Sequence, residues 1–471
     1  MSEGLILVVL FGILLSVIFL GSPICSSLGF TALIGMLIWL GTNQLQQFGV
    51  IAYSQGTNYN QIIAPMFIMM SEFLSQGHIA EDIYSVLNRV TGKVKGGLAI
   101  STTLACTIFA ALCGSSPATA ASIGRISIFQ MIKHGYSPKF AVGTVAAGGT
   151  LGIMIPPSIT FVVYGILTET SIVQLFMAGI LPGLLLATLI ILYIIISVRI
   201  KPEIIDQLSK QKQTQNCADE IAGISARELI DEVVSIAQEG DIARKLDSNN
   251  GQALEKRVGV LTILPAIVLI FIVLGSMYTG FATPLEAAGY GVVGSLVLLI
   301  IQKRITKKIF FSVMSNTIRT GTMMIFLVIC GFTLTHVVSY LGIAQSISRW
   351  IAGSGLNKYV VLLMLYALWF ILGALMDPAS MTILTIPFLF KTLMELGFDR
   401  IWLGVVMVLG AQIAMLTPPV GMNLFVLKAN TDVPMADIIS GTLPYILVLL
   451  LGLAILTIFP GISTLLPSLM F

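Results

Sequence analysis

The feature that most limits the possible folds of this chain is an internal repeat. Residue 135 aligns with residue 397, and the same offset of 262 residues aligns the other glycine and proline motifs. The matched motifs are Gly135-Tyr136 with Gly397-Phe398, Gly114-Ser115-Ser116-Pro117 with Met376-Asp377-Pro378-Ala379, Pro156-Pro157 with Pro418-Pro419, and Gly179-Ile180-Leu181-Pro182 with Gly441-Thr442-Leu443-Pro444. Two membrane repeats with helix breaks at matching positions predict a binding site at their interface. That arrangement is typical of secondary transporters.

Composition places these repeats in a lipid bilayer. The 471 residues are 56% hydrophobic and 10% charged, which is more apolar surface than a soluble protein can bury. The five cysteines form no Cys-x-x-Cys pair, and the three histidines are scattered. We find no phosphate-binding glycine loop and no nucleophilic triad. The sequence therefore predicts a multi-pass membrane protein that is neither an enzyme nor a nucleic-acid partner.

Hydropathy divides the chain into two membrane repeats. Continuous apolar runs long enough to cross a bilayer cover 4–21, 23–41, 60–76, 171–200, 258–278, 282–302, 321–340 and 443–468. The first repeat is 1–200, with a hairpin at 97–133 and a broken helix at 138–168. The second is 258–471, with a hairpin at 358–397 and a broken helix at 400–430. We expect an all-α polytopic fold with two re-entrant helical hairpins and two broken helices.

Basic residues set the orientation. With the N-terminus in the periplasm, most lysines and arginines that flank apolar segments lie on the cytoplasmic side. The first hairpin then enters from the cytoplasm and the second from the opposite face, which gives the repeats inverted topology. The polar segment 201–257 becomes a cytoplasmic loop with one short amphipathic helix after Ser225. We interpret it as a solvated connector; the alternative is a docking or regulatory segment.

Four breaks interrupt the apolar helices, and irregular backbone at membrane depth is tolerated only beside protein or a watery cavity. The first is the hairpin tip 113–119, and the second is the glycine- and proline-rich stretch 148–158. Such breaks expose carbonyl oxygens, which suit hard cations, and a helix N-terminus, which suits a carboxylate. The repeat supplies their counterparts, the tip 373–380 and the stretch 411–423.

Asp377 is the polar side chain that most needs an explanation. It lies inside the second apolar hairpin, opposite Ser115 in the repeat alignment. A carboxylate within a membrane is costly and usually functional. We interpret Asp377 as linked to an ion or a substrate; the alternative is a helix N-cap satisfied by the local backbone.

As a set, these motifs resemble the large membrane subunit of a tripartite ATP-independent periplasmic (TRAP) transporter, over nearly the whole chain except about 201–257. The resemblance is carried by Gly114-Ser115-Ser116-Pro117-Ala118-Thr119-Ala120, by the stretches 146–158 and 175–183, and by Leu416-Thr417-Pro418-Pro419-Val420-Gly421. It implies a sodium-driven, elevator-type importer of an organic acid, such as a C4-dicarboxylate or sialic acid, in a bacterial inner membrane. It also implies a periplasmic substrate-binding protein and a small four-helix membrane subunit, here a separate chain.

The same resemblance implies two sodium sites and a substrate site. Sodium (Na+) would be held by Ser115 and Ser116 with the backbone of Gly152, Ile155 and Pro157 in the first repeat. In the second it would be held by Gly373 and Asp377 with Ala414, Thr417 and Val420. Substrate would lie between the hairpin tips. The candidate substrate ligands are Ser115, Ser116, Thr119, Ser158, Asp377, Ser380 and Asn423.

Two other functions fit the same residues. A stand-alone divalent-anion symporter with similar paired hairpins would need no binding protein. A passive ion channel would pass current without saturable, sodium-dependent uptake, although two inverted hairpins favour coupled transport. Coupling requires only that ion and substrate prefer the same conformation. The sequence identifies neither the acid nor the number of sodium ions carried.

Overall fold

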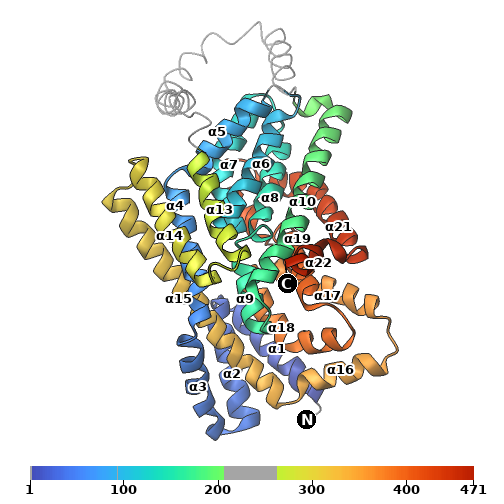
Figure 1. Ribbon diagram of the computed structural model, residues 1–471. Coiled ribbons are helices and arrows are strands. Elements are labelled where there is room, and N and C mark those ends of the chain that lie inside the picture. The colour runs from blue at the N-terminus through green and yellow to red at the C-terminus, as the bar shows by residue number, and fades with distance from the viewer. Residues whose placement is uncertain (1–2, 93, 206–262, 419, 471) are drawn as a thin grey trace, which may run out of the picture.

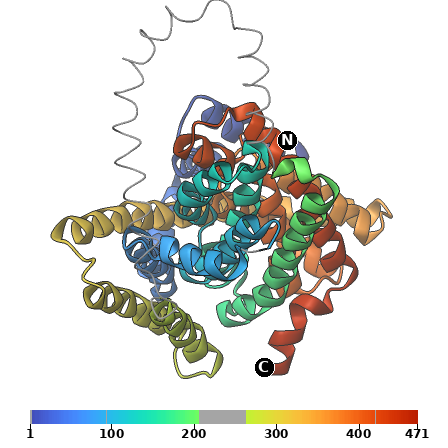
Figure 2. The same cartoon turned by 90° about the horizontal axis from the view of Figure 1, so that it is seen from above.

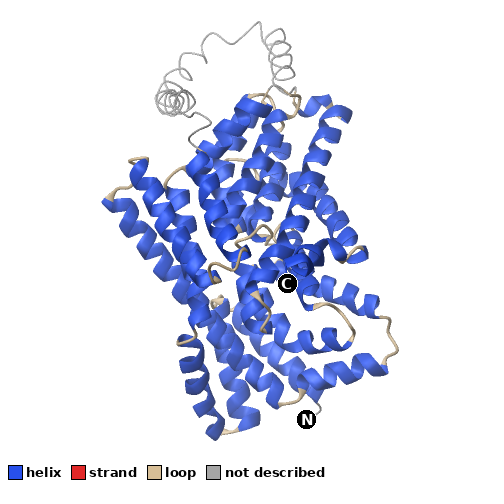
Figure 3. Ribbon diagram, viewed as in Figure 1, coloured by secondary structure: helices blue, strands red, loops and turns tan. Residues whose placement is uncertain are grey.

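The computed structural model describes residues 3–92, 94–205, 263–418 and 420–470. Throughout these ranges the chain forms helices and loops and no strand (Figure 3). A helix satisfies its own backbone hydrogen bonds, as a segment that faces lipid must. The predicted all-α fold is confirmed. Four helices in the described ranges are long and apolar enough to cross a membrane, namely α10 (Ile172–Ile200), α14 (Pro284–Ile301), α15 (Lys307–Tyr340) and α21 (Met435–Ile458).

The remaining helices fall into the same two halves of the chain. In the first half they are α1 (Glu3–Phe19), α2 (Ile24–Gly35), α3 (Leu45–Gly56), α4 (Ile63–Gln76), α5 (Ile79–Thr91), α6 (Gly97–Cys113), α7 (Ser116–Lys133), α8 (Pro138–Thr150) and α9 (Ile159–Thr168). In the second half they are α13 (Leu264–Tyr278), α16 (Ile343–Gly353), α17 (Lys358–Gly373), α18 (Pro378–Glu395), α19 (Arg400–Ala414), α20 (Met422–Asn430) and α22 (Gly461–Met470). The amphipathic helix predicted after Ser225 lies outside the described residues.

The two halves repeat the same order of helices. α7 starts at Ser116 and its counterpart α18 at Pro378, 262 residues later. α8 at Pro138 and α19 at Arg400 keep this offset. Hairpin α6–α7 lies in the upper half of Figure 1 and hairpin α17–α18 in the lower half. The hairpins therefore approach the centre from opposite ends, as expected of inverted repeats.

Packing sorts the helices into two groups. The outer group consists of α1–α4 and α13–α15, and the hairpin group consists of α6–α10 and α17–α22. Seen from above, α13–α15 stand to one side of the hairpin helices and α21 to the other (Figure 2). Amphipathic α5 follows α4 and precedes α6, while α16 follows α15 and precedes α17. Each of these two helices therefore links the groups within one half, at opposite ends of the molecule (Figure 1).

Two membrane segments differ from the sequence prediction. The prediction of one continuous helix over 443–468 is wrong, because α21 ends at Ile458 and α22 begins at Gly461. Between them Pro460 lacks the N–H that would continue the helix. The predicted span 321–340 is the second part of a longer helix, since α15 already starts at Lys307. Hydropathy misses that start because it carries basic residues.

Helices α8 and α21 cross where two glycines let their backbones meet. A Cβ on Gly143 would lie 2.1 Å from Gly441 O, and a Cβ on Gly441 would lie 2.1 Å from Lys139 O. Beside the crossing, Thr144 Oγ1 and Tyr445 OH are 2.7 Å apart and share a buried hydrogen bond. Because α8 and α21 belong to different repeats, this crossing joins the two halves.

We expect Gly143→Ala to lower the free energy of unfolding by about 3 kcal/mol, the upper range for overpacking, because the added methyl group meets backbone. Gly12→Ala in α1 is the matched control, since nothing lies within 4 Å of a Cβ there. Alanine at that exposed helix position should be neutral or mildly stabilising. Thermal unfolding in detergent measures both variants, and equal melting temperatures would show that the crossing tolerates a methyl group.

Candidate functional site at the hairpin tips

The first hairpin turns within two residues. Gly114 follows α6 with a φ of 65°, a left-handed angle that glycine adopts without strain, and Ser115 is extended. α7 then starts at Ser116 with Pro117 in its first turn. The Ser115 side chain makes no capping hydrogen bond to α7. Its hydroxyl and the N-terminus of α7 are therefore available to an anion.

The first broken helix closes around this tip through backbone contacts. A Cβ on Gly114 would lie 2.4 Å from Pro157 O, and a Cβ on Gly152 would lie 2.6 Å from Ser115 O. Only glycine permits either approach. Thr119 Oγ1 donates to Ser115 O at 2.8 Å. The Ser115 carbonyl oxygen is thus the point at which the hairpin and the broken helix meet.

Ser158 holds the far end of the same break. Its Oγ donates to Ile153 O at 2.6 Å and accepts from Phe161 N at 3.4 Å, which caps α9. The side chain is fully buried. Both bonds lie within the broken helix, so the observed role of Ser158 is to stabilise the bend.

The second hairpin tip carries a carboxylate at its helix start. Asp377 caps α18, because Oδ2 accepts from Ser380 N at 3.1 Å and Oδ1 accepts from the Ser380 hydroxyl. Asp377 is therefore a helix N-cap, and this role does not by itself exclude a bound ion. However, both bonds come from a neutral partner, and within the described ranges Asp377 forms no ion pair. The side chain is also partly exposed. An unpaired charge in an apolar hairpin remains able to bind a cation.

The second broken helix meets this tip much as the first one meets its own. A Cβ on Gly373 would lie 2.6 Å from Ala414 Cβ. Gly421 N donates to Ala374 O at 3.2 Å, which joins the start of α20 to the hairpin. Each half of the chain therefore pairs one hairpin tip with one broken helix.

One hydrogen bond joins the two repeats beside the first tip. Asn423 Nδ2 in α20 donates to Ser116 Oγ at 2.7 Å, although 307 residues separate them in the sequence. Both side chains are fully buried, and Asn423 Oδ1 has no donor within the part of the chain that the structure describes. A buried amide oxygen without a donor costs free energy. The interface between the repeats thus presents an acceptor suited to a bound donor or cation.

These contacts gather most of the predicted site residues into two clusters. They are Ser115, Ser116, Thr119, Gly152, Pro157 and Asn423 around the first tip, and Gly373, Asp377, Ser380 and Ala414 around the second. Three carried-over ligands direct their side chains elsewhere. The Ile155 side chain packs toward Gly183 of α10. Thr417 Oγ1 donates to Ile413 O at 2.8 Å, and Val420 is 37% exposed. For Ile155 the resemblance assigns the backbone and not the side chain. As ion ligands, these three residues and all the others carried over stay predictions.

Oxygen atoms dominate both clusters. Across the described residues no three His, Cys, Asp or Glu side chains come together in a metal-binding group. A cation at either tip would instead meet hydroxyl, amide and carbonyl oxygens, with the carboxylate of Asp377 at the second tip. Such ligands suit a hard cation rather than a transition metal.

Gln412 is a polar residue to which the sequence analysis gives no role. It is fully buried in α19, and neither Nε2 nor Oε1 has a partner within the described structure. Its counterpart in the first repeat, Thr150, donates to Ala147 O at 2.7 Å. The signal that could have marked it is an amide side chain in the middle of an apolar helix.

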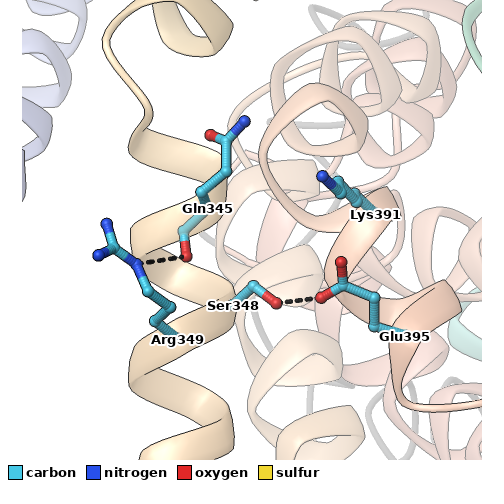
Figure 4. Close-up of a pocket in the computed structure, with 5 residues that line it drawn as sticks. All are labelled: Gln345, Ser348, Arg349, Lys391 and Glu395. Atoms are coloured by element: carbon cyan, nitrogen blue, oxygen red, sulfur yellow. Dashed lines mark hydrogen bonds between the residues drawn. The ribbon is translucent and has the colours of Figure 1, made fainter.

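A separate polar pocket lies on the surface between α16 and α18 (Figure 4). Its lining consists of Gln345, Ser348, Arg349, Lys391 and Glu395. Ser348 donates to Glu395, and Arg349 Nε donates to Gln345 O at 3.4 Å. The first of these bonds holds the connecting helix α16 against the second hairpin. None of the five residues belongs to either tip cluster.

Comparison with known proteins identifies the family. A sequence model of the family described as "Tripartite ATP-independent periplasmic transporter, DctM component" matches residues 11–462. The chain belongs to this family. Among its relatives is the "C4-dicarboxylate TRAP transporter large permease protein DctM" of Pseudomonas aeruginosa, 33% identical over 443 residues and 94% of each chain. Another is the "Isethionate TRAP transporter permease protein DctMQ" of Oleidesulfovibrio alaskensis, 28% identical over 96% of this chain and 65% of that one.

Solved structures support the fold of this TRAP family member. The YdaH transporter of Alcanivorax borkumensis superposes with a TM-score of 0.60, covering 92% of this chain and 91% of that one at 14% identity. At that identity the likeness shows the fold alone. The resemblance inferred from the hairpin and double-proline motifs is confirmed by the family match over nearly the whole chain.

Proposed function

We propose that this chain is the large membrane subunit of a TRAP transporter that imports a small organic acid together with sodium ions. The main support is the hydrogen bond between Ser116 and Asn423, which leaves a buried acceptor where both repeats meet beside a hairpin tip. That acceptor suits the sodium ion, and the uncapped start of α7 beside it suits a carboxylate of a C4-dicarboxylate or of sialic acid. The two relatives are named for a C4-dicarboxylate and for isethionate, both small organic anions.

The two tips favour opposite charges, which gives coupling a physical basis. The uncapped start of α7 attracts a carboxylate, while Asp377 at the start of α18 repels it. A sodium ion beside Asp377 removes that repulsion. Ion and acid then stabilise the same arrangement of the tips, so each raises the affinity for the other.

The division into two groups of helices supports an elevator mechanism. Every candidate ligand lies in the hairpin group. Along the described chain of each half, the covalent path from the outer group to that group runs through one connecting helix, α5 or α16. The hairpin group can therefore carry the site along the outer group as a rigid body, with the connecting helices as hinges.

The same proposal assigns location and partners. The chain would lie in a bacterial inner membrane, with its N-terminus in the periplasm and loop 201–257 in the cytoplasm. A periplasmic substrate-binding protein would deliver the acid. The match covers 65% of the DctMQ permease, and we assign the remainder of that relative to a small four-helix membrane subunit, which here would be a separate chain.

Uptake into proteoliposomes tests the proposed function. Labelled C4-dicarboxylates and sialic acid are offered with an inward sodium gradient or without one, and with or without the small subunit and binding protein. We expect uptake only when the gradient and both partners are present. Uptake without the binding protein would favour a stand-alone symporter. A voltage-driven current without saturable uptake would indicate a channel.

A further inference from the structure

Two hydrogen bonds connect α4 of the outer group to the first hairpin. Ser71 Oγ lies 2.8 Å from Cys113 Sγ, and Ser75 Oγ lies 2.9 Å from Ser122 Oγ. We call these four side chains the α4 seam. Ser71 and Ser75 are four residues apart and therefore on one face of α4. Both bonds consequently form at a single position of the hairpin along the helix.

Cys113 extends the α4 seam to the candidate site. Its thiol donates to Ser115 O at 3.7 Å, and the Ser71 hydroxyl can then donate to Sγ. Both Ser71 and Cys113 are buried, so water does not compete for these bonds. A chain of hydrogen bonds thus runs from the outer group to the carbonyl oxygen at which the hairpin and the broken helix meet.

The second repeat has no counterpart of this seam. At the 262-residue offset the four positions are Thr333, Val337, Leu375 and Leu384. The Thr333 hydroxyl donates to Ile329 O within its own helix. α15 meets α18 through an apolar contact instead, since a Cβ on Gly331 would lie 2.1 Å from Ile383 Cγ2. The repeat fold therefore does not require a hydrogen-bonded seam at these positions, and of the two repeats the first one has it.

We propose that Ser71 is a positioning residue that, through Cys113, ties the geometry of the first hairpin tip to the position of the hairpin group. The inference rests on the proposed elevator function. Hydrogen bonds are specific in distance and angle, so they add a defined register to the packing between the two groups. When the hairpin group moves along α4, both seam bonds break together and Cys113 loses its support. The α4 seam thus defines one stopping point of the movement and couples it to the tip.

Substituting Ser71→Cys tests the contact with the native Cys113. The observed separation of 2.8 Å is close enough for a disulfide, whose sulfurs lie about 2.05 Å apart, after a small rotation of the side chains. Oxidation with copper phenanthroline should link the two cysteines, as mass spectrometry of the joined peptides would show. In proteoliposomes the oxidised variant should lose uptake at least about 10-fold, and dithiothreitol should restore it.

Ser71→Cys combined with Cys113→Ala is the control, because oxidation should leave its uptake unchanged. Absence of the linked peptide would show that Ser71 and Cys113 are not in contact. A linked protein with normal uptake would show that this contact does not need to break during transport. If Ser71→Cys does not fold, the pair Ser75→Cys and Ser122→Cys makes the same test at the second seam bond. The peptide analysis does not depend on transport, so failure of the proposed function remains distinguishable from failure of the seam.

Conservative replacement of Cys113 separates positioning from packing. Cys113→Ser keeps a donor and acceptor between Ser71 and Ser115 O, whereas Cys113→Ala keeps neither. We expect the sodium concentration that gives half-maximal uptake to rise about 3- to 10-fold in Cys113→Ala, which corresponds to the loss of one hydrogen bond. In Cys113→Ser that concentration should stay near the native value. Equal sodium dependence of the two variants, at equal expression, would reduce Cys113 to a packing residue.

Discussion

Asp377→Asn is expected to lower sodium-driven uptake by about 100-fold, the loss that follows when a charged ligand worth ~3 kcal/mol is removed. Asparagine caps a helix as well as aspartate does, so the bonds from Ser380 to the cap persist. Only the negative charge disappears, and with it the attraction for the cation at the second tip. Uptake driven by an inward sodium gradient, measured at matched expression, reports the effect.

Asp399→Asn is the matched control for that experiment. Asp399 also caps a helix, accepting from Ile401 N at 2.9 Å and Trp402 N at 2.8 Å, but it lies at the far end of α19 from the tips. We expect native uptake from this variant. Sodium dependence unchanged in Asp377→Asn would remove Asp377 from the transport mechanism and leave it a helix cap.

Arg304→Ala is expected to cost about 3 kcal/mol of stability, because it leaves a buried carboxylate without its cation. Asp82 is 1% exposed, and Arg304 Nη1 lies 2.7 Å from its Oδ2. The same guanidinium donates to Gly77 O at 2.9 Å, so it fastens the turn between α4 and α5 to the loop before α15. A lower melting temperature in detergent would report the loss.

The loss of stability in Arg304→Ala should also depend on pH. Burial raises the pKa of Asp82, and Arg304 offsets that rise only in part. Without Arg304 the pKa rises further. A carboxyl whose folded-state pKa is raised contributes stability at low pH, and this stability is lost as pH rises through that pKa. Arg304→Ala should therefore be less destabilised near about pH 5 than near about pH 8.

Two variants sharpen that result. Adding Asp82→Asn to Arg304→Ala removes the buried charge and should recover most of the stability. Lys139→Ala breaks an exposed pair with Asp437, 3.1 Å apart, and should change stability by less than about 1 kcal/mol. If Arg304→Ala lowers stability no more than Lys139→Ala does, the buried pair of Asp82 and Arg304 does not stabilise the contact between the α4–α5 turn and the loop before α15.

Much of the hairpin architecture follows from local sequence signals. The Gly114 turn and Pro117 predict where α6 ends and α7 begins, because glycine takes the left-handed angle without strain and proline favours the first turn of a helix. The amphipathic helices α5 and α16 were harder to foresee, since their apolar residues occupy one face and leave no continuous apolar run.

The assembled site could not be derived from local signals alone. The bond from Asn423 to Ser116 and the contact of Ser71 with Cys113 join residues 307 and 42 positions apart. Such pairs depend on how helices cross, which glycine contacts and side-chain volumes decide only in the folded chain. The sequence shows Gln412 as an amide within an apolar helix, but its complete burial and its lack of a partner depend on the helices packed around α19.

The meeting of the first tip with its broken helix has a consequence for how such importers diversify. Gly114 against Pro157 O and Gly152 against Ser115 O are contacts made by the main chain, and any side chain added at either glycine would break them. Under the proposed function, selectivity for a new acid would then change at hydroxyl and amide positions such as Thr119 and Asn423. Under the proposed mechanism, the main-chain framework around the ions would stay the same while the imported acid changes, so a new nutrient would not require new energy coupling.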